Sequence, residues 1–126
     1  MSPRRGAQLL AASRAALGVA VLAAPEQVTS RWLGAHSAHP VVRYLARSLG
    51  ARDLALGVLA LATLDDPELG PRTQVWCAVA DSVDALATVA ARSDLPPVGV
   101  AGTVAAAGAA AGAGLLFSRR LAQHAP

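Results

Sequence analysis

Apolar residues gather into four long runs along the chain, separated by short stretches rich in proline, glycine and charge. Each run is close to the ~20 residues that a helix needs to cross a hydrocarbon core of ~30 Å. The intervening proline and acidic clusters stop helices and prefer water. The pattern therefore predicts one domain, an all-α four-helix transmembrane bundle with up-down-up-down topology. The predicted spans are approximately residues 6–24, 44–64, 73–91 and 98–117 of the domain 1–126.

Small and ionisable residues recur at helical spacing within the first three runs. Steps of three and four residues put them on one face of each helix. Because small residues let another helix approach closely, these faces are predicted to point into the bundle. The three predicted interior stripes are Ala7, Ala11, Arg14, Gly18 and Val21, then Ala46, Gly50, Asp53, Gly57 and Ala60, then Thr73, Cys77, Asp81, Asp84 and Thr88.

Five charged residues stand in the middle of the predicted spans, away from their ends: Arg14, Arg52, Asp53, Asp81 and Asp84. An unpaired charge at mid-bilayer costs at least ~2.5–3.5 kcal/mol, so these side chains are expected to pair with one another. Helix rise places Arg14, Arg52 and Asp81 roughly 12 Å below the surface at which their own helices begin. With alternating helix directions, this register predicts the pairs Arg14 with Asp81 and Arg52 with Asp84. Two arginines then face three aspartates, which leaves one carboxylate in excess.

Composition supports a lipid environment and excludes several kinds of site. The chain is 54% hydrophobic, with a mean hydropathy of +0.43. Its net charge of +3 comes from scattered arginines that form no basic face, so nucleic acid is not an expected partner. A single cysteine gives no disulfide framework. His36 and His39 have no carboxylate or thiol at ligand spacing, so neither a metal nor another cofactor is predicted.

The arginines near the ends of the spans predict the orientation. Five of them fall on the side of the N-terminus and three on the other side, which favours a multi-pass protein of the plasma membrane with both termini inside. The first run could instead be a secretory signal, but Arg14 interrupts it and Pro25 follows the only plausible cleavage position. A soluble, alanine-rich bundle also stays open, because alanine is only marginally apolar.

Two short motifs carry a resemblance to a known family. They are Gly50-Ala51-Arg52-Asp53-Leu54-Ala55-Leu56-Gly57 in the second run and Ala80-Asp81-Ser82-Val83-Asp84-Ala85, preceded by Trp76, in the third. With these motifs the chain resembles a family of small four-helix membrane proteins of unknown function that is frequent in actinobacteria and DoxX-like in general character. The resemblance implies four spans, with an Arg-Asp element in the second and an Asp-rich third. It implies no mechanism.

Three functions are compatible with the charged residues. In the first, the protein is an accessory or interaction subunit, a homo-oligomer or the partner of another membrane protein, and the ions only hold the helices together. In the second, it is a membrane enzyme that opens an epoxide or isomerises an apolar small molecule, with Asp81 or Asp84 as general base, a protonated aspartate as acid and Arg52 orienting both. In the third, it is a proton-coupled transporter like the small multidrug-resistance proteins, although those depend on a glutamate in the first helix and the first helix here carries Arg14. A cavity of a few hundred Å³ beside Asp81 and Asp84 would favour a ligand, whereas a purely structural cluster should be collapsed.

Overall fold

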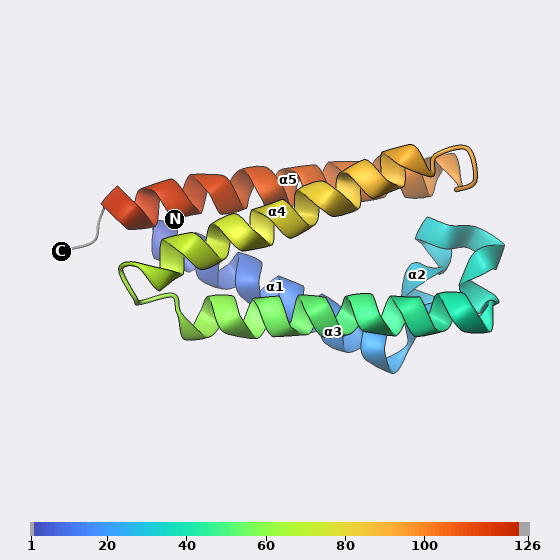
Figure 1. Cartoon of the computed structure of the whole chain (residues 1–126), viewed down its shortest axis with the longest axis horizontal. Helices are drawn as coiled ribbons and strands as arrows, with labels where there is room; N and C mark the ends of the chain where they lie inside the picture. Colours follow the sequence, from blue (N-terminus) through green and yellow to red (C-terminus); the bar gives the residue numbers. More distant parts are fainter. Residues whose placement is uncertain (1, 124–126) are drawn as a thin grey trace.

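The computed structural model describes residues 2–123, and within this range the chain is entirely helical. The all-α class is confirmed, with five α-helices, a short 3₁₀-helix and no strand among the described residues. The four long helices run alternately in opposite directions (Figure 1). In chain order the elements are α1 (Pro3–Ala23), α2 (Pro25–Leu33), η1 (Gly34–Ala38), α3 (Pro40–Ala62), α4 (Leu69–Ala90) and α5 (Pro97–Gln123).

The helix starts are set by proline and by side-chain caps. Pro3, Pro25 and Pro40 each occupy the first turn of a helix, where the missing N–H costs nothing and the fixed φ is already helical. At α4, the Asp66 Oδ1 atom accepts hydrogen bonds from the backbone N–H groups of Glu68, at 2.9 Å, and Leu69, at 2.7 Å. These signals lie in the polar flanks, so α1, α3 and α4 begin three or four residues before the spans predicted from hydropathy.

The connection between the first two long helices is more ordered than expected. The predicted spans leave residues 25–43 as a connection without a helix, but Pro25–Leu33 forms α2, so the four-helix prediction is wrong by one short helix. Glu26 in its first turn and Arg31 in its last turn both complement the helix dipole. Gly34 ends α2 with a φ of +59°, a conformation that favours glycine.

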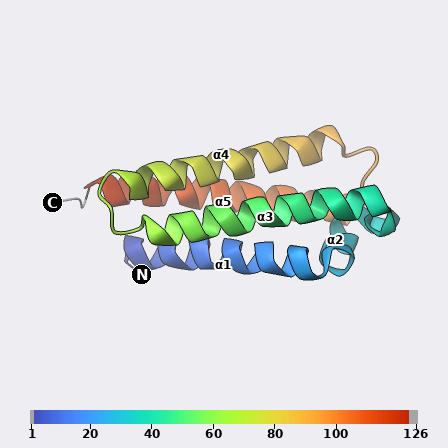
Figure 2. The same ribbon diagram turned by 60° about the horizontal axis from the view of Figure 1, so that its bottom comes forward.

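The long helices form two antiparallel hairpins. The N-terminal hairpin, residues 3–62, packs α1 against α3, with α2 and η1 at its closed end. The C-terminal hairpin, residues 69–123, packs α4 against α5. Contacts between the hairpins are sparser than contacts within them. All four long helices lie along the long axis of the molecule, with α2 at the end of α1 (Figure 2). The start of α1, the end of α5 and the α3–α4 connection lie at one end of the molecule, and α2 with the α4–α5 connection at the other.

Glycine allows the two helices of the N-terminal hairpin to touch through their backbones. A Cβ built on Gly57 would lie 2.6 Å from the backbone nitrogen of Ala15 and 2.8 Å from the carbonyl oxygen of Ala11. The predicted stripe of α3 is confirmed, because its five residues are the buried residues of that helix. The stripe of α1 is buried too, with Gly6 in addition. In α4 the stripe is buried except for Asp84, which is half-buried.

Large apolar side chains lie mostly on the outside of the bundle. The buried apolar residues are mainly small: Ala7, Ala11, Val21, Ala46, Ala60, Leu64, Cys77, Ala78 and Ala111. The exposed set includes Leu9, Leu17, Val19, Leu45, Val58, Leu59, Val79, Val83, Leu86, Leu115 and Leu116. Arg14, Asp53 and Asp81 are instead buried. This distribution is the opposite of the one expected for a protein folded in water.

Two helices meet the length and composition of a membrane span, namely α1 and α5. The helices α3 and α4 have similar lengths, 23 and 22 residues, but do not meet the composition criterion. The charged residues of the predicted interior are concentrated in these two helices and lower their hydropathy. Four spans were predicted, and two are supported on this criterion.

Candidate functional site

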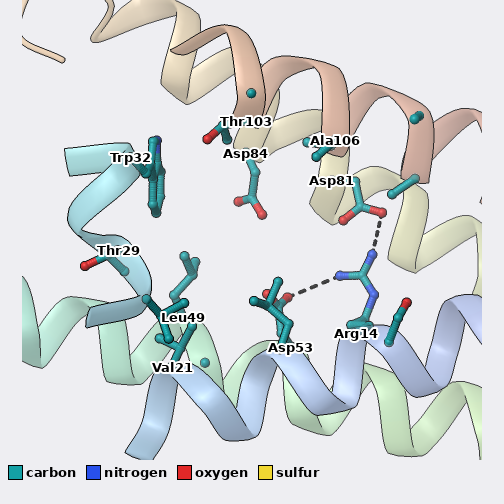
Figure 3. Close-up of a pocket in the computed structure, with 18 of the residues that line it drawn as sticks. Arg14, Val21, Thr29, Trp32, Leu49, Asp53, Asp81, Asp84, Thr103 and Ala106 are labelled. Atoms are coloured by element: carbon teal, nitrogen blue, oxygen red, sulfur yellow. Dashed lines mark hydrogen bonds and ion pairs between the residues drawn. The ribbon is translucent and has the colours of Figure 1, made fainter. Parts of the chain in front are cut away.

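Arg14, in the middle of α1, binds one carboxylate in each hairpin. Its Nη1 atom donates to Asp53 Oδ1 of α3 at 3.2 Å, and its Nη2 atom donates to Asp81 Oδ2 of α4 (Figure 3). All three residues are buried. Burial of an ionised side chain is tolerated only when opposite charges and hydrogen bonds compensate for lost solvation. The three residues supply that compensation for one another.

Arg52 makes the second connection between the hairpins. Its Nη1 atom donates to Asp84 Oδ1 at 3.0 Å, and its Nη2 atom donates to Asp84 Oδ2 at 2.6 Å, which is the bidentate geometry favoured by guanidinium and carboxylate. The same Nη2 atom donates to Asp53 Oδ1 at 3.1 Å. Asp53 Oδ1 therefore accepts from both arginines and links them into one network, which we call the ion cluster: Arg14, Arg52, Asp53, Asp81 and Asp84.

The glycines of the interior stripes bring the members of the ion cluster within reach. Gly50 and Gly57 lie one turn before and one turn after Asp53 on α3, and Gly18 lies one turn after Arg14 on α1. Because these glycines leave the two backbones in contact, the Arg14 side chain can reach Asp53. If larger residues replaced these glycines, the two helices would stand further apart and the Arg14–Asp53 hydrogen bond would lengthen.

The two ion pairs predicted from helix register, Arg14 with Asp81 and Arg52 with Asp84, are both present. The role of Asp53 as the shared acceptor was not predicted. Gln74 was also missed, although it is only 1% exposed and its Nε2 atom is buried without a hydrogen-bond acceptor. It lies seven residues before Asp81, on the same side of α4, and that spacing was the available signal.

A cavity of about 710 Å³ opens beside the ion cluster. It lies between α1 and α5, with α2 at one end (Figure 3). Four members of the cluster line it: Arg14, Asp53, Asp81 and Asp84. The rest of the wall is largely apolar and comes from Leu10, Leu17, Val21, Val28, Trp32, Leu49 and the small residues Gly102, Ala106, Ala107, Ala109, Ala110 and Ala113 of α5, with hydroxyls from Ser13, Thr29 and Thr103.

The cavity wall carries more negative than positive charge. Three carboxylates and one guanidinium line it, whereas Arg52 holds Asp84 and Asp53 from outside the cavity and is 33% exposed. Asp53 Oδ2 and Asp81 Oδ1 take no part in the ion pairs between the described residues. These oxygens can accept hydrogen bonds from a ligand or take up a proton. No group of three or more His, Cys, Asp or Glu side chains in residues 2–123 is arranged to hold a metal ion.

Two further carboxylates, outside the ion cluster, accept hydrogen bonds at the α3–α4 connection. The Arg4 Nε and Nη2 atoms donate to Asp65 Oδ1 at 2.7 Å and Oδ2 at 2.8 Å, and this hydrogen bonding lowers the pKa of the Asp65 carboxyl. The backbone N–H groups of Leu69 and Glu68 likewise lower the pKa of the Asp66 carboxyl. Both contacts are exposed and fasten the connection to the starts of α1 and α4.

No protein-family model matches the chain, and no curated protein or solved structure has significant similarity to it. The resemblance to the actinobacterial four-helix membrane family therefore rests on the two motifs around Arg52 and Asp81.

Proposed function

We propose that the protein spans the plasma membrane four times, through α1, α3, α4 and α5, with both termini on the cytoplasmic side. The observation that supports this proposal is the distribution of side chains along the long helices, with many leucines and valines exposed and Arg14, Asp53, Asp81 and small residues buried. At a rise of ~1.5 Å per residue, the shortest of the four helices, with 21 residues, is just long enough for a ~30 Å core. On this proposal α2 lies at the outer surface of the bilayer.

We further propose that the protein binds an apolar or amphipathic small molecule in the cavity beside the ion cluster. The observation that supports this proposal is the cavity itself. Its volume of about 710 Å³ falls in the range of ligand sites, and its wall is apolar with a few convergent polar groups. A cluster that only fastened helices together would be expected to exclude such a space. This observation favours a ligand-binding protein over a purely structural subunit.

An acid/base enzyme is the second candidate, because Arg14 holds Asp53 and Asp81 side by side and both line the cavity. Asp81 is the better general base, since one of its oxygens is outside the ion pairs, whereas Arg52 engages both oxygens of Asp84. Epoxide opening and isomerisation remain the reactions that suit this set. Comparing the metabolites of reconstituted native protein and Asp81→Asn tests the enzyme, because only a catalyst converts one species into another.

Membrane fractionation tests the first proposal. The expressed chain should stay with the membrane pellet through washes in high salt and alkaline carbonate, and detergent should release it. Single cysteines placed near residues 2 and 123, in a Cys77→Ala background, should react with an impermeant thiol reagent only after the cells are opened. A chain that is released without detergent would contradict the proposal.

Filling the cavity tests the second proposal. Ala106 lines the cavity, whereas its neighbour Ala105 is exposed on α5 and does not line it. The variant Ala106→Phe should lose an apolar molecule that copurifies with the native protein, and the matched variant Ala105→Phe should retain it. Mass spectrometry of lipid extracts provides the measurement. Identical extracts from the two variants and the native protein would argue against a ligand in this cavity.

A further inference from the structure

The excess of negative charge on the cavity wall favours a cationic ligand. This inference rests on the proposed function, in which the cavity binds a small molecule. The ion cluster contains two arginines and three aspartates, so its net charge is −1 when all five are ionised. Among the described residues that line the cavity, Arg14 alone carries a guanidinium, and this group is already bound to two carboxylates. In a medium of low dielectric constant, a monocation placed against this wall would neutralise the excess. An anion would add to it.

The cavity opens sideways, between the middle parts of α1 and α5. Ser13 and Leu17 of α1, together with Ala106 and Ala109 of α5, line the cavity and are exposed at the same time. One end of the cavity is covered by Thr29 and Trp32 of α2 (Figure 3). The open side therefore faces the surroundings of the bundle, which on the proposed function are the acyl chains of lipids. A ligand would enter from the bilayer and needs an apolar body.

The shape of the wall complements such a body. The face of α5 that lines the cavity is made of glycine, alanine and one threonine, so it presents a smooth apolar surface without long side chains. The carboxylates of Asp53 and Asp81 lie across the cavity from α2. An elongated molecule can thus lie along α5 and place a polar group at the ion cluster.

We propose that the cavity between α1 and α5 binds a cationic amphiphile, an amine with a single apolar chain, whose ammonium group is held by Asp53 and Asp81. The ammonium donates to the carboxylate oxygens that Arg14 leaves outside its ion pairs. The apolar chain packs against α5. A neutral alcohol of the same length fits the same space but gains no charge neutralisation, and a fatty acid is repelled.

Trp32 provides a direct readout of occupancy. It lines the cavity, whereas the other tryptophan, Trp76, is exposed on α4. In a Trp76→Phe background, fluorescence reports on Trp32 alone. The probes are a terminally brominated dodecylamine, the matching alcohol and the matching fatty acid, each titrated into protein in zwitterionic lipid nanodiscs near pH 7. Bromine that enters the cavity quenches the fluorescence, and Ala106→Phe gives the background from probe dissolved in lipid.

The amine should quench saturably at a concentration at least about tenfold lower than the alcohol, and the fatty acid should give only the Ala106→Phe background. Equal quenching by amine and alcohol, or stronger quenching by the fatty acid, would overturn the cationic inference and leave the ligand-binding proposal standing. No saturable quenching by any probe would overturn both. This ranking uses the native ion cluster, so it does not depend on a charge variant that folds poorly.

A charge variant then locates the interaction. In Asp81→Asn, the amine should quench at a concentration close to that of the alcohol. The matched variant Asp94→Asn, in the exposed α4–α5 connection, should retain the native preference for the amine. An unchanged preference in a folded Asp81→Asn protein would overturn the assignment of the ammonium site to Asp81.

Discussion

Gly18 of α1 and Gly50 of α3 touch backbone to backbone. A Cβ built on Gly18 would lie 2.6 Å from the carbonyl oxygen of Gly50, and one built on Gly50 would lie 2.9 Å from the carbonyl oxygen of Gly18. Real Cβ atoms do not approach a backbone atom this closely, so either substitution must push the two helices apart. The separation would also pull Arg14 away from Asp53.

Gly18→Ala is therefore expected to destabilise the protein by about 1–3 kcal/mol, the range typical of overpacking. Thermal unfolding in detergent provides the measurement. Gly108→Ala is the control, since a Cβ at Gly108 meets nothing within 4 Å. The control should leave stability unchanged or raise it by up to ~1 kcal/mol through helix propensity. Equal effects of the two substitutions would contradict the close packing of α1 on α3.

Arg52 and Asp84 should behave as one unit in a double-mutant cycle. Arg52→Ala leaves Asp84 without its bidentate partner, and Asp84→Ala leaves Arg52 with Asp53 alone. The double variant should cost less than the sum of the single variants, by about 0.5–3 kcal/mol, which is the usual range for directly contacting residues. Unfolding free energies of the four proteins measure this coupling. Additive losses would rule out the ion pair.

The identity of the surrounding medium can be tested with an arginine scan on the outer face of α4. Val83 and Leu69 are 54% and 49% exposed, but Val83 lies well within the helix and Leu69 is its first residue. In lipid, Val83→Arg should cost about 2.5–3.5 kcal/mol of insertion free energy, whereas Leu69→Arg should be tolerated at the interface. The fraction of chain inserted in the membrane measures the difference. In water, both substitutions would be harmless.

The start of α4 should loosen in acid. Because the pKa of Asp66 is lowered in the folded protein, its stabilising hydrogen bonds are fully present above the ordinary carboxyl pKa and are lost as the pH falls through the folded value. Amide hydrogen exchange around Leu69, corrected for its intrinsic pH dependence, should be constant from neutral pH to about pH 5 and rise below about pH 4. Asp66→Asn retains an acceptor oxygen but has no carboxylate to protonate, so its corrected exchange should not show this rise. The same acid response in Asp66→Asn would assign it to another group.

The interior of the bundle could be predicted from sequence because charge and residue size repeat at helical spacing. Asp53 falls on a stripe of glycine and alanine, and a carboxylate on such a face has only the interior in which to find a partner. The Arg14–Asp81 and Arg52–Asp84 pairs followed from helix rise and alternating direction alone, since both depend only on regular geometry.

Other features depend on contacts that spacing does not contain. The helix α2 has no long apolar run, so hydropathy gives no sign of it, and proline clusters between the runs are interpreted only as positions that stop helices. The cavity lies between α1 and α5 beside Arg14, and the angle at which two helices pack is set by their whole contact surface. Whether the ion cluster borders a space or a packed interior could not be inferred from one stripe at a time.

The division of the molecule into two hairpins has a consequence for its biogenesis. The hairpin 3–62 contributes Arg14, Arg52 and Asp53 to the ion cluster, a sum of +1, whereas the hairpin 69–123 contributes Asp81 and Asp84, a sum of −2. If the helices enter the bilayer as proposed, neither half does so with its charges balanced, and association of the halves reduces the sums of +1 and −2 to a net charge of −1. Assembly of the halves is thus selective for the correct mate, and two chains severed between residues 62 and 69 should find each other in the membrane.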